Sequence, residues 1–212
     1  MNGGSRSVHL VVSVAVLSIV VLGLTASAAH GGVLVSSAAS CDSYRFEQPF
    51  LRWADPAQYV FAPNGGFERG ARGWTLTGGA RIVAGNESYR VHGRRDSVSL
   101  SLPPGSSATS GAMCVGIEHP TLRLFTTNRG ALMSMLAVEV LFEDATGAVH
   151  SLPIGLLAAT SAWRPSVQMP VVANLLPLLP GERTAVAFRF TPLGASGQWR
   201  IDDTYVDPYR SR

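Results

Sequence analysis

The chain has 212 residues, 46% of them apolar, and a formal net charge of +3, which fits one globular domain with an additional segment. All 17 basic residues are Arg, which excludes a P-loop, because it needs a lysine, and Schiff-base catalysis, because it needs an amine. The small net charge also argues against nucleic-acid binding, since the one basic cluster, from Arg90 to Arg95, is interrupted and reads as a solvated loop. We interpret the Arg-only usage as the base bias of a bacterial genome.

The N-terminal residues read as a secretory signal peptide. Arg6 precedes an uncharged, mostly apolar run from Leu10 to Leu24, and Ala26-Ser27-Ala28 offers a small-residue cleavage site. The run is shorter than the ~20 residues that a membrane-spanning helix needs. We therefore predict a signal peptide over residues 1–28 and an extracytoplasmic protein, secreted or in the cell envelope. The alternative is that this segment is retained as an anchor, which would be the only contact with a membrane.

The next two segments lead into the domain. Residues 29–41 are small and almost uncharged, and we predict a flexible leader. Residues 42–63 contain too many aromatic residues for a linker, so we expect them to pack on the domain. Two cysteines in an oxidising compartment usually pair, which predicts a disulfide between Cys41 and Cys114. The alternative is two free thiols.

Residues 64–212 have the pattern of an all-β domain. Glycine, proline and asparagine turn signals recur at short intervals, and runs of strand length lie between them, as in a β-sandwich. The segment from Thr75 to Val83 predicts a hairpin over Gly78-Gly79. The alternation from Thr184 to Thr191 places Val186, Phe188 and Phe190 on one face. Residues 154–159 and 171–179 are each compatible with a short helix that a proline ends.

Three motifs in order give a resemblance to a known family. The sequence N-G-G-F-E from Asn64 to Glu68, followed by Trp74, resembles the opening strand of many carbohydrate-binding modules. The closing segment from Trp199 to Val206 resembles their W-x-I-D-D strand, and Ser161 to Val167 resembles the entry of their W-x-x-x-x-V strand, with one residue fewer between Trp163 and Val167. The resemblance implies a galactose-binding-like jelly roll, in which two antiparallel sheets pack face to face over residues 60–207 and helices are short turns in loops. It also implies that Trp74, Trp163 and Trp199 are structural core residues.

The same resemblance implies a structural calcium near the first and last strands. Phe67 is expected in the core, so alternation turns Glu68 outward, and at least one of Asp202 and Asp203 also faces away from the core. Carboxylates brought together there would repel, and calcium would resolve this with oxygen ligands that include Asn64. The alternative is that a neighbouring arginine neutralises these carboxylates or that water hydrates them. No other cofactor is expected.

A secreted, non-catalytic module that binds a carbohydrate or a cell-surface glycan is the first functional hypothesis. Such a site combines an exposed aromatic with polar groups. Tyr89 and His92 are the aromatic candidates, and Glu139, Arg189 and Arg200 are the polar candidates because they lie opposite the apolar positions of their strands.

Two other functions stay open. A structural or adhesive envelope protein with the same fold would have its concave face filled with apolar residues, or covered by residues 42–63 or 153–180. A hydrolytic enzyme is the third reading, because the carboxylates allow a glycosidase pair, although the chain has neither an H-E-x-x-H motif nor a G-x-S-x-G motif. The expected partner is a glycan or a component of the cell envelope.

Overall fold

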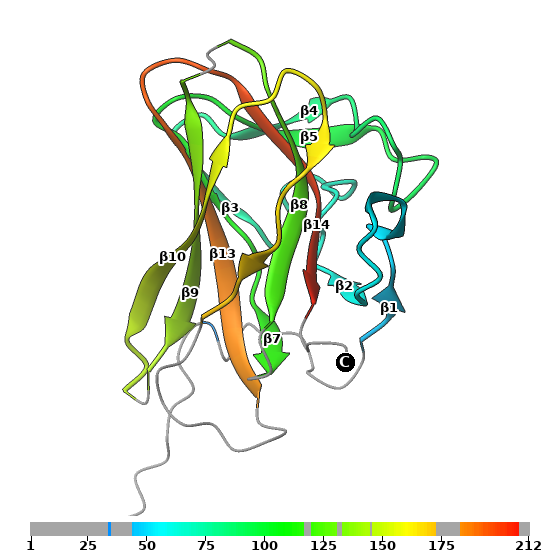
Figure 1. The fold of residues 1–212 in the computed structure, drawn as a ribbon. Helices are drawn as coiled ribbons and strands as arrows, with labels where there is room; N and C mark the ends of the chain where they lie inside the picture. The colour runs from blue at the N-terminus through cyan, green and yellow to red at the C-terminus, as the bar shows by residue number, and fades with distance from the viewer. Residues whose placement is uncertain are drawn as a thin grey trace, which may run out of the picture.

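The computed structural model describes residues 34, 44–116, 120–130, 133–144, 146–172 and 183–207. The predicted signal peptide, most of the leader, Cys41 and residues 173–179 lie outside the described residues. The described part is built from two antiparallel sheets that pack face to face (Figure 1). This confirms the predicted all-β sandwich. Among these residues no helix is long and apolar enough to span a membrane.

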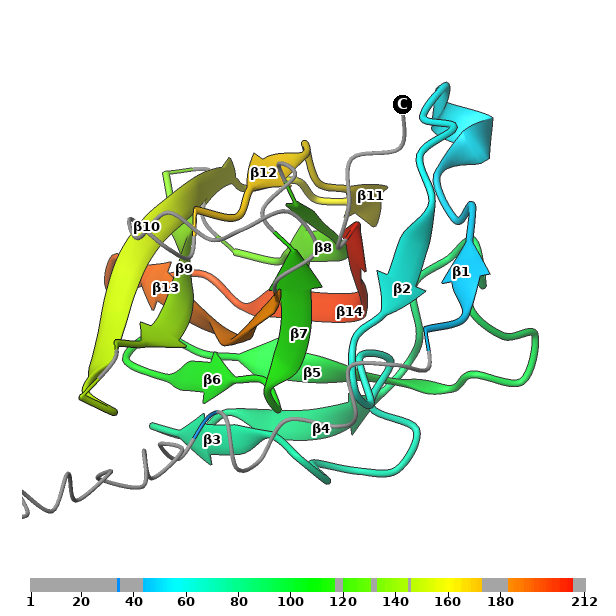
Figure 2. The ribbon, with the colours of Figure 1, turned by 90° about the horizontal axis from the view of Figure 1, so that it is seen from below.

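The first sheet, called sheet A, has the closing strand of the chain at its centre. One edge of that strand pairs with β5 and then with β2, and its other edge pairs with β8. Further strands extend the sheet outward on both sides (Figure 2). Its members are β1 (Phe46–Glu47), β2 (Tyr59–Phe61), β4 (Arg81–Ala84), β5 (Val98–Leu102), β8 (Thr121–Asn128), β11 (Arg164–Pro165), β12 (Met169–Pro170) and β14 (Trp199–Asp207).

The second sheet, called sheet B, is centred on β13. That strand pairs with β9 along one edge and with β6 and β7 along the other. β10 then extends the sheet beyond β9, and β3 extends it beyond β6. Its members are β3 (Thr75–Thr77), β6 (Ser107–Thr109), β7 (Met113–Gly116), β9 (Met135–Glu143), β10 (Val149–Ala158) and β13 (Arg183–Leu193).

Alternation along the strands builds the core between the sheets. In β13, Val186, Phe188 and Phe190 are fully buried there, as predicted. Phe67, which closes the N-G-G-F segment, is fully buried in the same core. Each of these side chains removes apolar surface from water, at roughly 25 cal/mol per Å². The core is therefore the main source of the stability of the sandwich.

Two local predictions are wrong. The segments on either side of Gly78-Gly79 do not form a hairpin, because β3 pairs with β6 in sheet B and β4 pairs with β5 in sheet A. The glycine pair instead carries the chain from one sheet to the other, and a Cβ at Gly78 would lie 2.2 Å from the Gly105 carbonyl oxygen. Residues 154–159 are not helical, since β10 runs through most of them and pairs with β9.

A bulge in β14 reverses which side chains face the core. Asp202 pairs with Phe125 and Tyr205 with Arg123, so two residues of β14 oppose one residue of β8. Asp203 has a φ of 42° at this point. Before the bulge Trp199 points into the core between the sheets, whereas after it Tyr205 points to the outer face of sheet A.

The N-terminal segment covers this outer face. β1, the 3-10 helix η1 (Leu51–Trp53) and β2 bring Phe50 and Tyr59 against Phe125 and Tyr205, and all four are fully buried. Phe50 stacks on Phe125 with ring centroids 5.6 Å apart. Sheet A is therefore apolar on both faces, with the main core on one side and this aromatic cluster on the other.

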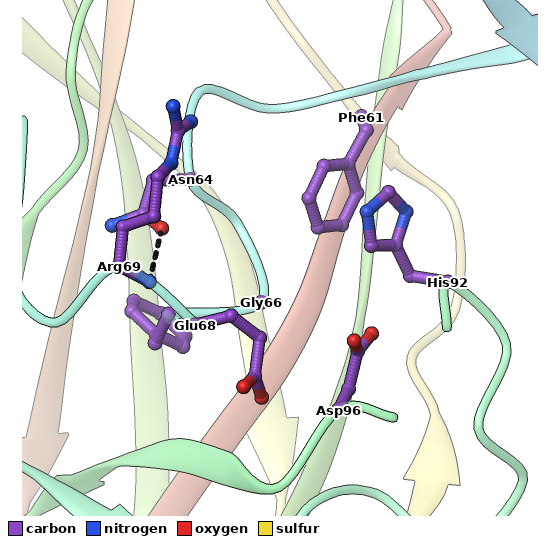
Figure 3. Close-up of a pocket in the computed structure, with 8 residues that line it drawn as sticks. Phe61, Asn64, Gly66, Glu68, Arg69, His92 and Asp96 are labelled. Carbon is purple, nitrogen blue, oxygen red and sulfur yellow. Dashed lines mark hydrogen bonds between the residues drawn. The ribbon is translucent and has the colours of Figure 1, made fainter. Parts of the chain in front are cut away.

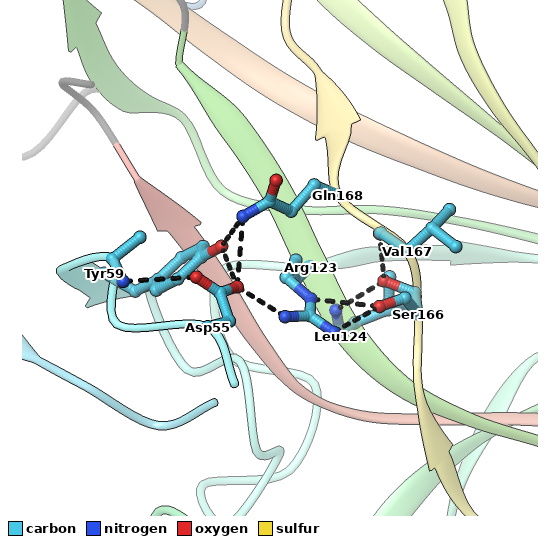
Figure 4. A network of polar contacts seen from close by, with 8 residues as sticks. Asp55, Tyr59, Arg123, Leu124, Ser166, Val167 and Gln168 are labelled. Atoms are coloured by element: carbon cyan, nitrogen blue, oxygen red, sulfur yellow. Dashed lines mark hydrogen bonds and ion pairs between the residues drawn. The ribbon is translucent and has the colours of Figure 1, made fainter. Parts of the chain in front are cut away.

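A buried polar network fixes the segment in place (Figure 4). Arg123 on β8 forms an ion pair with Asp55 and donates to the Ser166 carbonyl oxygen through Nε at 2.9 Å and Nη2 at 2.7 Å. Tyr59 donates to Asp55 at 2.7 Å, and Gln168 donates to both Asp55 and Tyr59 at 3.1 Å. Burial raises the pKa of Asp55, but these hydrogen bonds outweigh it and hold the pKa below its usual value.

Candidate functional site

The loop between β4 and β5, residues 85–97 and called the β4–β5 loop, lies beside η1 (Figure 1). Carboxylates hold its backbone from inside. Glu87, only 1% exposed, accepts from the N–H groups of Tyr89 and Val91. Asp202 accepts from the Glu87 N–H at 2.8 Å, and Asp203 accepts from the His92 N–H at 3.1 Å. The loop is therefore tied to β14.

The N-G-G-F-E motif holds the far end of the same loop. Glu68 Oε1 accepts from the N–H groups of Ser97 at 2.6 Å and Val98 at 3.0 Å. The preceding glycines allow the turn to lie directly against the β14 bulge, because a Cβ at Gly65 would be 2.8 Å from the Thr204 carbonyl oxygen. A Cβ at Gly66 would be 2.9 Å from Asp203 Oδ1. The opening and closing segments of the domain thus meet at this loop.

Asp202 and Asp203 are both fully buried. They are therefore not carboxylates at the surface that water hydrates, which was one of the alternatives from the sequence. Burial, together with the charge of the neighbouring Asp203, raises the pKa of Asp202 to about 9. Burial also raises the pKa of Asp203 to about 7, against the hydrogen bond from the His92 N–H. Oδ1 of Asp203 has no hydrogen-bond partner among the described residues. Charge on this pair is therefore costly at neutral pH.

A cavity of about 260 Å³ opens beside these carboxylates and extends to Glu68, His92 and Asp96 (Figure 3). The His92 ring stacks on Phe61 with centroids 3.6 Å apart and an angle of 4° between the ring planes. Burial raises the pKa of Asp96. The cavity thus has an aromatic wall and an acidic wall.

The predicted calcium ligands converge here, but most of their oxygens already accept hydrogen bonds. The side-chain oxygen of Asn64 accepts from the Arg69 N–H at 3.3 Å, and its amide nitrogen donates to the Gly70 and Arg72 carbonyl oxygens. Within the described ranges, no three or more His, Cys, Asp or Glu side chains are arranged to hold a metal. A calcium ion would therefore depend on Asp203 Oδ1 with backbone carbonyls, and calcium stays a prediction.

A second, open groove lies on the other side of the β4–β5 loop, between the loop and η1. It is lined by Gln48, Pro49, Leu51, Arg52, Tyr89 and Val91. The Arg52 guanidinium lies over the Tyr89 ring at 4.9 Å and over the Trp53 ring at 5.0 Å. Trp53 and Tyr89 meet edge to face at 4.9 Å, and both are half-buried. The groove therefore presents aromatic surface next to an exposed cation.

Trp163 and Arg200 continue this aromatic surface across sheet A. Tyr89 Oη donates to the Trp163 carbonyl oxygen at 3.2 Å, and the Arg200 guanidinium lies 5.7 Å from the Trp163 ring. Arg200 also donates to Ser99 Oγ and to the Ala84 carbonyl oxygen, so its position is fixed. Trp163 is half-buried and packs against the outer aromatic cluster, whereas Trp74 and Trp199 lie in the core between the sheets.

The candidate ligand residues fall into two groups. Tyr89, His92 and Arg200 lie at or near the β4–β5 loop. Glu139 and Arg189 lie on sheet B and bind each other through two contacts, at 2.7 and 3.0 Å. They do not contribute to the groove.

Sequence reasoning did not single out Arg52, which lines the groove, or Trp53, which packs against Tyr89 beside it. They lie in the aromatic-rich segment over residues 42–63, and that aromatic content is the only signal that pointed to them. Cys114 is buried in β7 and is not a free thiol. Because Cys41 lies outside the described residues, the Cys41–Cys114 disulfide stays a prediction.

The sequence matches no protein-family model and no curated protein sequence. Solved structures are similar in fold. The CBM22-1–GH10 modules of the Clostridium thermocellum endo-1,4-β-D-xylanase 10B, complexed with xylohexaose, match with a TM-score of 0.50 at 13% identity; the match covers 72% of this chain and 28% of that one.

Two further structures resemble the chain more weakly. The CBM22-1–CBM22-2 tandem of Paenibacillus barcinonensis Xyn10C has a TM-score of 0.48 at 12% identity, over 73% of this chain and 46% of that one. TmCBM61 in complex with β-1,4-galactotriose has a TM-score of 0.43 at 17% identity, over 69% of this chain and 96% of that one. The described domain is thus a jelly-roll β-sandwich with the fold of carbohydrate-binding modules.

Proposed function

We propose that the protein is a secreted, non-catalytic module that binds a glycan in the groove between η1 and the β4–β5 loop. The observation that carries the proposal is the arrangement of Arg52 over the rings of Trp53 and Tyr89 in an open groove. The fold likeness to carbohydrate-binding modules supports it without identifying a ligand.

The lining of the groove suits a sugar. The C–H faces of a pyranose ring are apolar and pack against aromatic rings, while its hydroxyls need donors and acceptors in fixed positions. Tyr89 supplies a ring that packing against Trp53 and Phe125 holds in place. Gln48 and the exposed guanidinium of Arg52 supply the polar groups. A glycan chain would lie along the open groove.

Calorimetric titration of the mature protein against neutral and acidic polysaccharides tests this proposal. Tyr89→Ala should weaken binding about three- to tenfold, because it removes a stacking surface. Tyr89→Phe, the matched control, keeps the ring and should bind nearly as the wild type does. Melting curves of both variants establish that they are folded. Flat titrations of folded wild-type protein across the whole panel would count against the proposal.

One observation favours a second function, a structural or adhesive envelope protein. Residues 44–61 cover the outer face of sheet A with a fully buried aromatic cluster, so much of that face is closed to a ligand. Such a protein would show no response in the titrations. Cell fractionation would then place it in the envelope rather than in the medium.

A further inference from the structure

The acidic side chains of the β4–β5 loop face the protein, whereas its arginines face the solvent. The loop carries two acids, Glu87 and Asp96, and both are turned toward the protein, where Glu87 accepts backbone N–H groups. Arg90, Arg94 and Arg95 are all exposed. The outer surface of the loop is therefore basic, although its sequence is nearly balanced.

The three arginines have different roles. Arg90 Nη1 donates to the carbonyl oxygens of Arg94 at 2.7 Å and Asp96 at 3.1 Å, so it holds the shape of the loop. Arg94 and Arg95 form no ion pair with a carboxylate in the part of the chain that the structure describes. Their charge is available to a partner.

The acids around the groove are already engaged. Glu47 lies 3.6 Å from Arg45, and Asp55 is paired with Arg123. Burial raises the pKa of Glu87, and the charge of Arg52 opposes this shift. Among the described residues, however, Glu87 and Arg52 form no ion pair. Arg52 thus lies over its two aromatic rings and forms no ion pair with a carboxylate of the described segments.

Glu68 is exposed, but it lines the cavity of Figure 3 and not the groove, and its Oε1 accepts from the N–H groups of Ser97 and Val98.

Further arginines lie beyond the groove, near Trp163. Burial lowers the pKa of Arg200, and the nearby charge of Arg129 lowers it further. Arg129 and Arg164 are both exposed. Like charges gathered in this way repel one another unless an anion lies between them. Of these residues, Arg200 lies over the ring of Trp163, whose carbonyl oxygen accepts from Tyr89 Oη.

We propose that the groove selects anionic glycans, whose carboxylate or sulfate groups bind Arg52 and the Arg94–Arg95 pair while the sugar rings pack on Tyr89. The proposal rests on the glycan-binding function proposed above. Guanidinium groups suit it because they bind planar anions through two parallel hydrogen bonds. Charge attraction alone would bind any polyanion. Packing on Tyr89 requires in addition that a sugar ring lies beside the anionic group.

The test uses polygalacturonate and alginate, each beside its carboxyl-reduced form, which keeps the sugar chain and removes the charge. The mature protein should bind the acidic forms at least about tenfold more tightly. The preference should decrease from about 50 to about 250 mM NaCl. Arg52→Gln and the double variant Arg94→Gln/Arg95→Gln should each remove most of it.

Arg81→Gln is the matched control, because Arg81 is exposed at the end of β4 that is farther from the loop. Loss of the preference in that variant would overturn the proposal, since net charge alone would then explain it. Equal binding of acidic and reduced forms would overturn it and leave the glycan-binding function standing, whereas failure to bind any glycan would overturn both. Tighter binding of a single-stranded oligonucleotide than of either acidic glycan would also overturn it.

Discussion

Asp203 concentrates the unusual features of the site in one residue. It is fully buried, has a φ of 42° within a strand, and leaves Oδ1 without a hydrogen-bond partner among the described residues. Such a conformation outside glycine costs on the order of 1–3 kcal/mol. The β14 bulge and the hydrogen bond to the His92 N–H keep it in place. Asp203 is therefore the residue at which we expect protons, and a cation if one binds, to change stability.

Stability should fall as the pH rises through the neutral range. Both Asp202 and Asp203 have a pKa raised above the usual aspartate value of 3.8, so the folded state binds more protons than the unfolded state. Their contribution is fully present below about pH 4 and is lost as the pH rises through about 7 and then about 9. With chelator present, the melting temperature should drop on the order of 5–10 °C between pH 5 and pH 8.

The variant Asp203→Asn is the control for this pH effect. It cannot ionise at that position, so its melting temperature should change less over the same range. If the melting temperature of the variant fell with pH as steeply as that of the wild type, groups other than Asp203 would cause the effect. Below about pH 4 the sign reverses, because Asp55 and Glu139 have lowered pKa values and lose their ion pairs on protonation.

Calcium is expected to act on the same residues in the opposite direction. It would bind the charged form of Asp203 together with carbonyl oxygens of the Asn64–Gly66 turn, and Glu68 lies close enough to contribute to the field. Excess calcium should then raise the melting temperature at pH 8 by mass action. Identical midpoints with calcium and with chelator, in both the wild type and Glu68→Ala, would falsify the site.

The N-terminal segment is the element on which the proposed groove depends. β1, η1 and β2 supply Arg52 and Trp53, and the Asp55–Arg123 ion pair attaches them to β8. Arg123→Met should destabilise the protein by about 3–5 kcal/mol, because it leaves the Asp55 carboxylate buried without its cation. Urea denaturation measures this loss.

The exposed substitution Arg81→Gln gives a reference for this prediction. It should change the free energy of unfolding by less than about 0.5 kcal/mol. The double variant Asp55→Leu/Arg123→Met should recover much of the loss, since neither charge is then left alone. If Arg123→Met behaves like Arg81→Gln, the network does not hold the segment.

Sequence patterns predicted the elements of the sandwich well and its outer face poorly. Alternation identified the buried face of β13, because successive side chains of a regular strand point to opposite faces whatever packs against the strand. The hairpin predicted over Gly78-Gly79 was wrong, because two glycines permit a turn without determining which strands pair afterwards. In β14, alternation turned at least one of Asp202 and Asp203 away from the core, but it could not predict that both are fully buried, because the β4–β5 loop covers them.

The groove could not be predicted for a different reason. Arg52 and Tyr89 are distant in sequence and come together only because residues 44–61 fold over sheet A. No local period or motif describes that packing. The resemblance to carbohydrate-binding modules implied the overall fold from the N-G-G-F-E and W-x-I-D-D motifs, which lie beside the β4–β5 loop and not in the groove.

For the whole molecule, the two-sided burial of sheet A decides how much of the chain is needed to fold. A sandwich needs one apolar face on each sheet, yet Phe125 and Tyr205 make the outer face of sheet A apolar as well. Exposed together, these rings would form a patch that soluble domains avoid. The domain should therefore include residues 44–57, although the sequence motifs begin only at Asn64.

Two truncated proteins test this requirement, one beginning at residue 44 and one at residue 58. Both carry Cys114→Ser, so that the predicted disulfide is absent from each. The longer protein should unfold in one cooperative transition. The shorter protein should bind a hydrophobic dye and melt at a much lower temperature, since it has lost Phe50, Trp53 and the carboxylate of Asp55 that neutralises Arg123. Equal melting temperatures without dye binding would show that sheet A is stable with its outer face open, and the segment would then serve the groove alone.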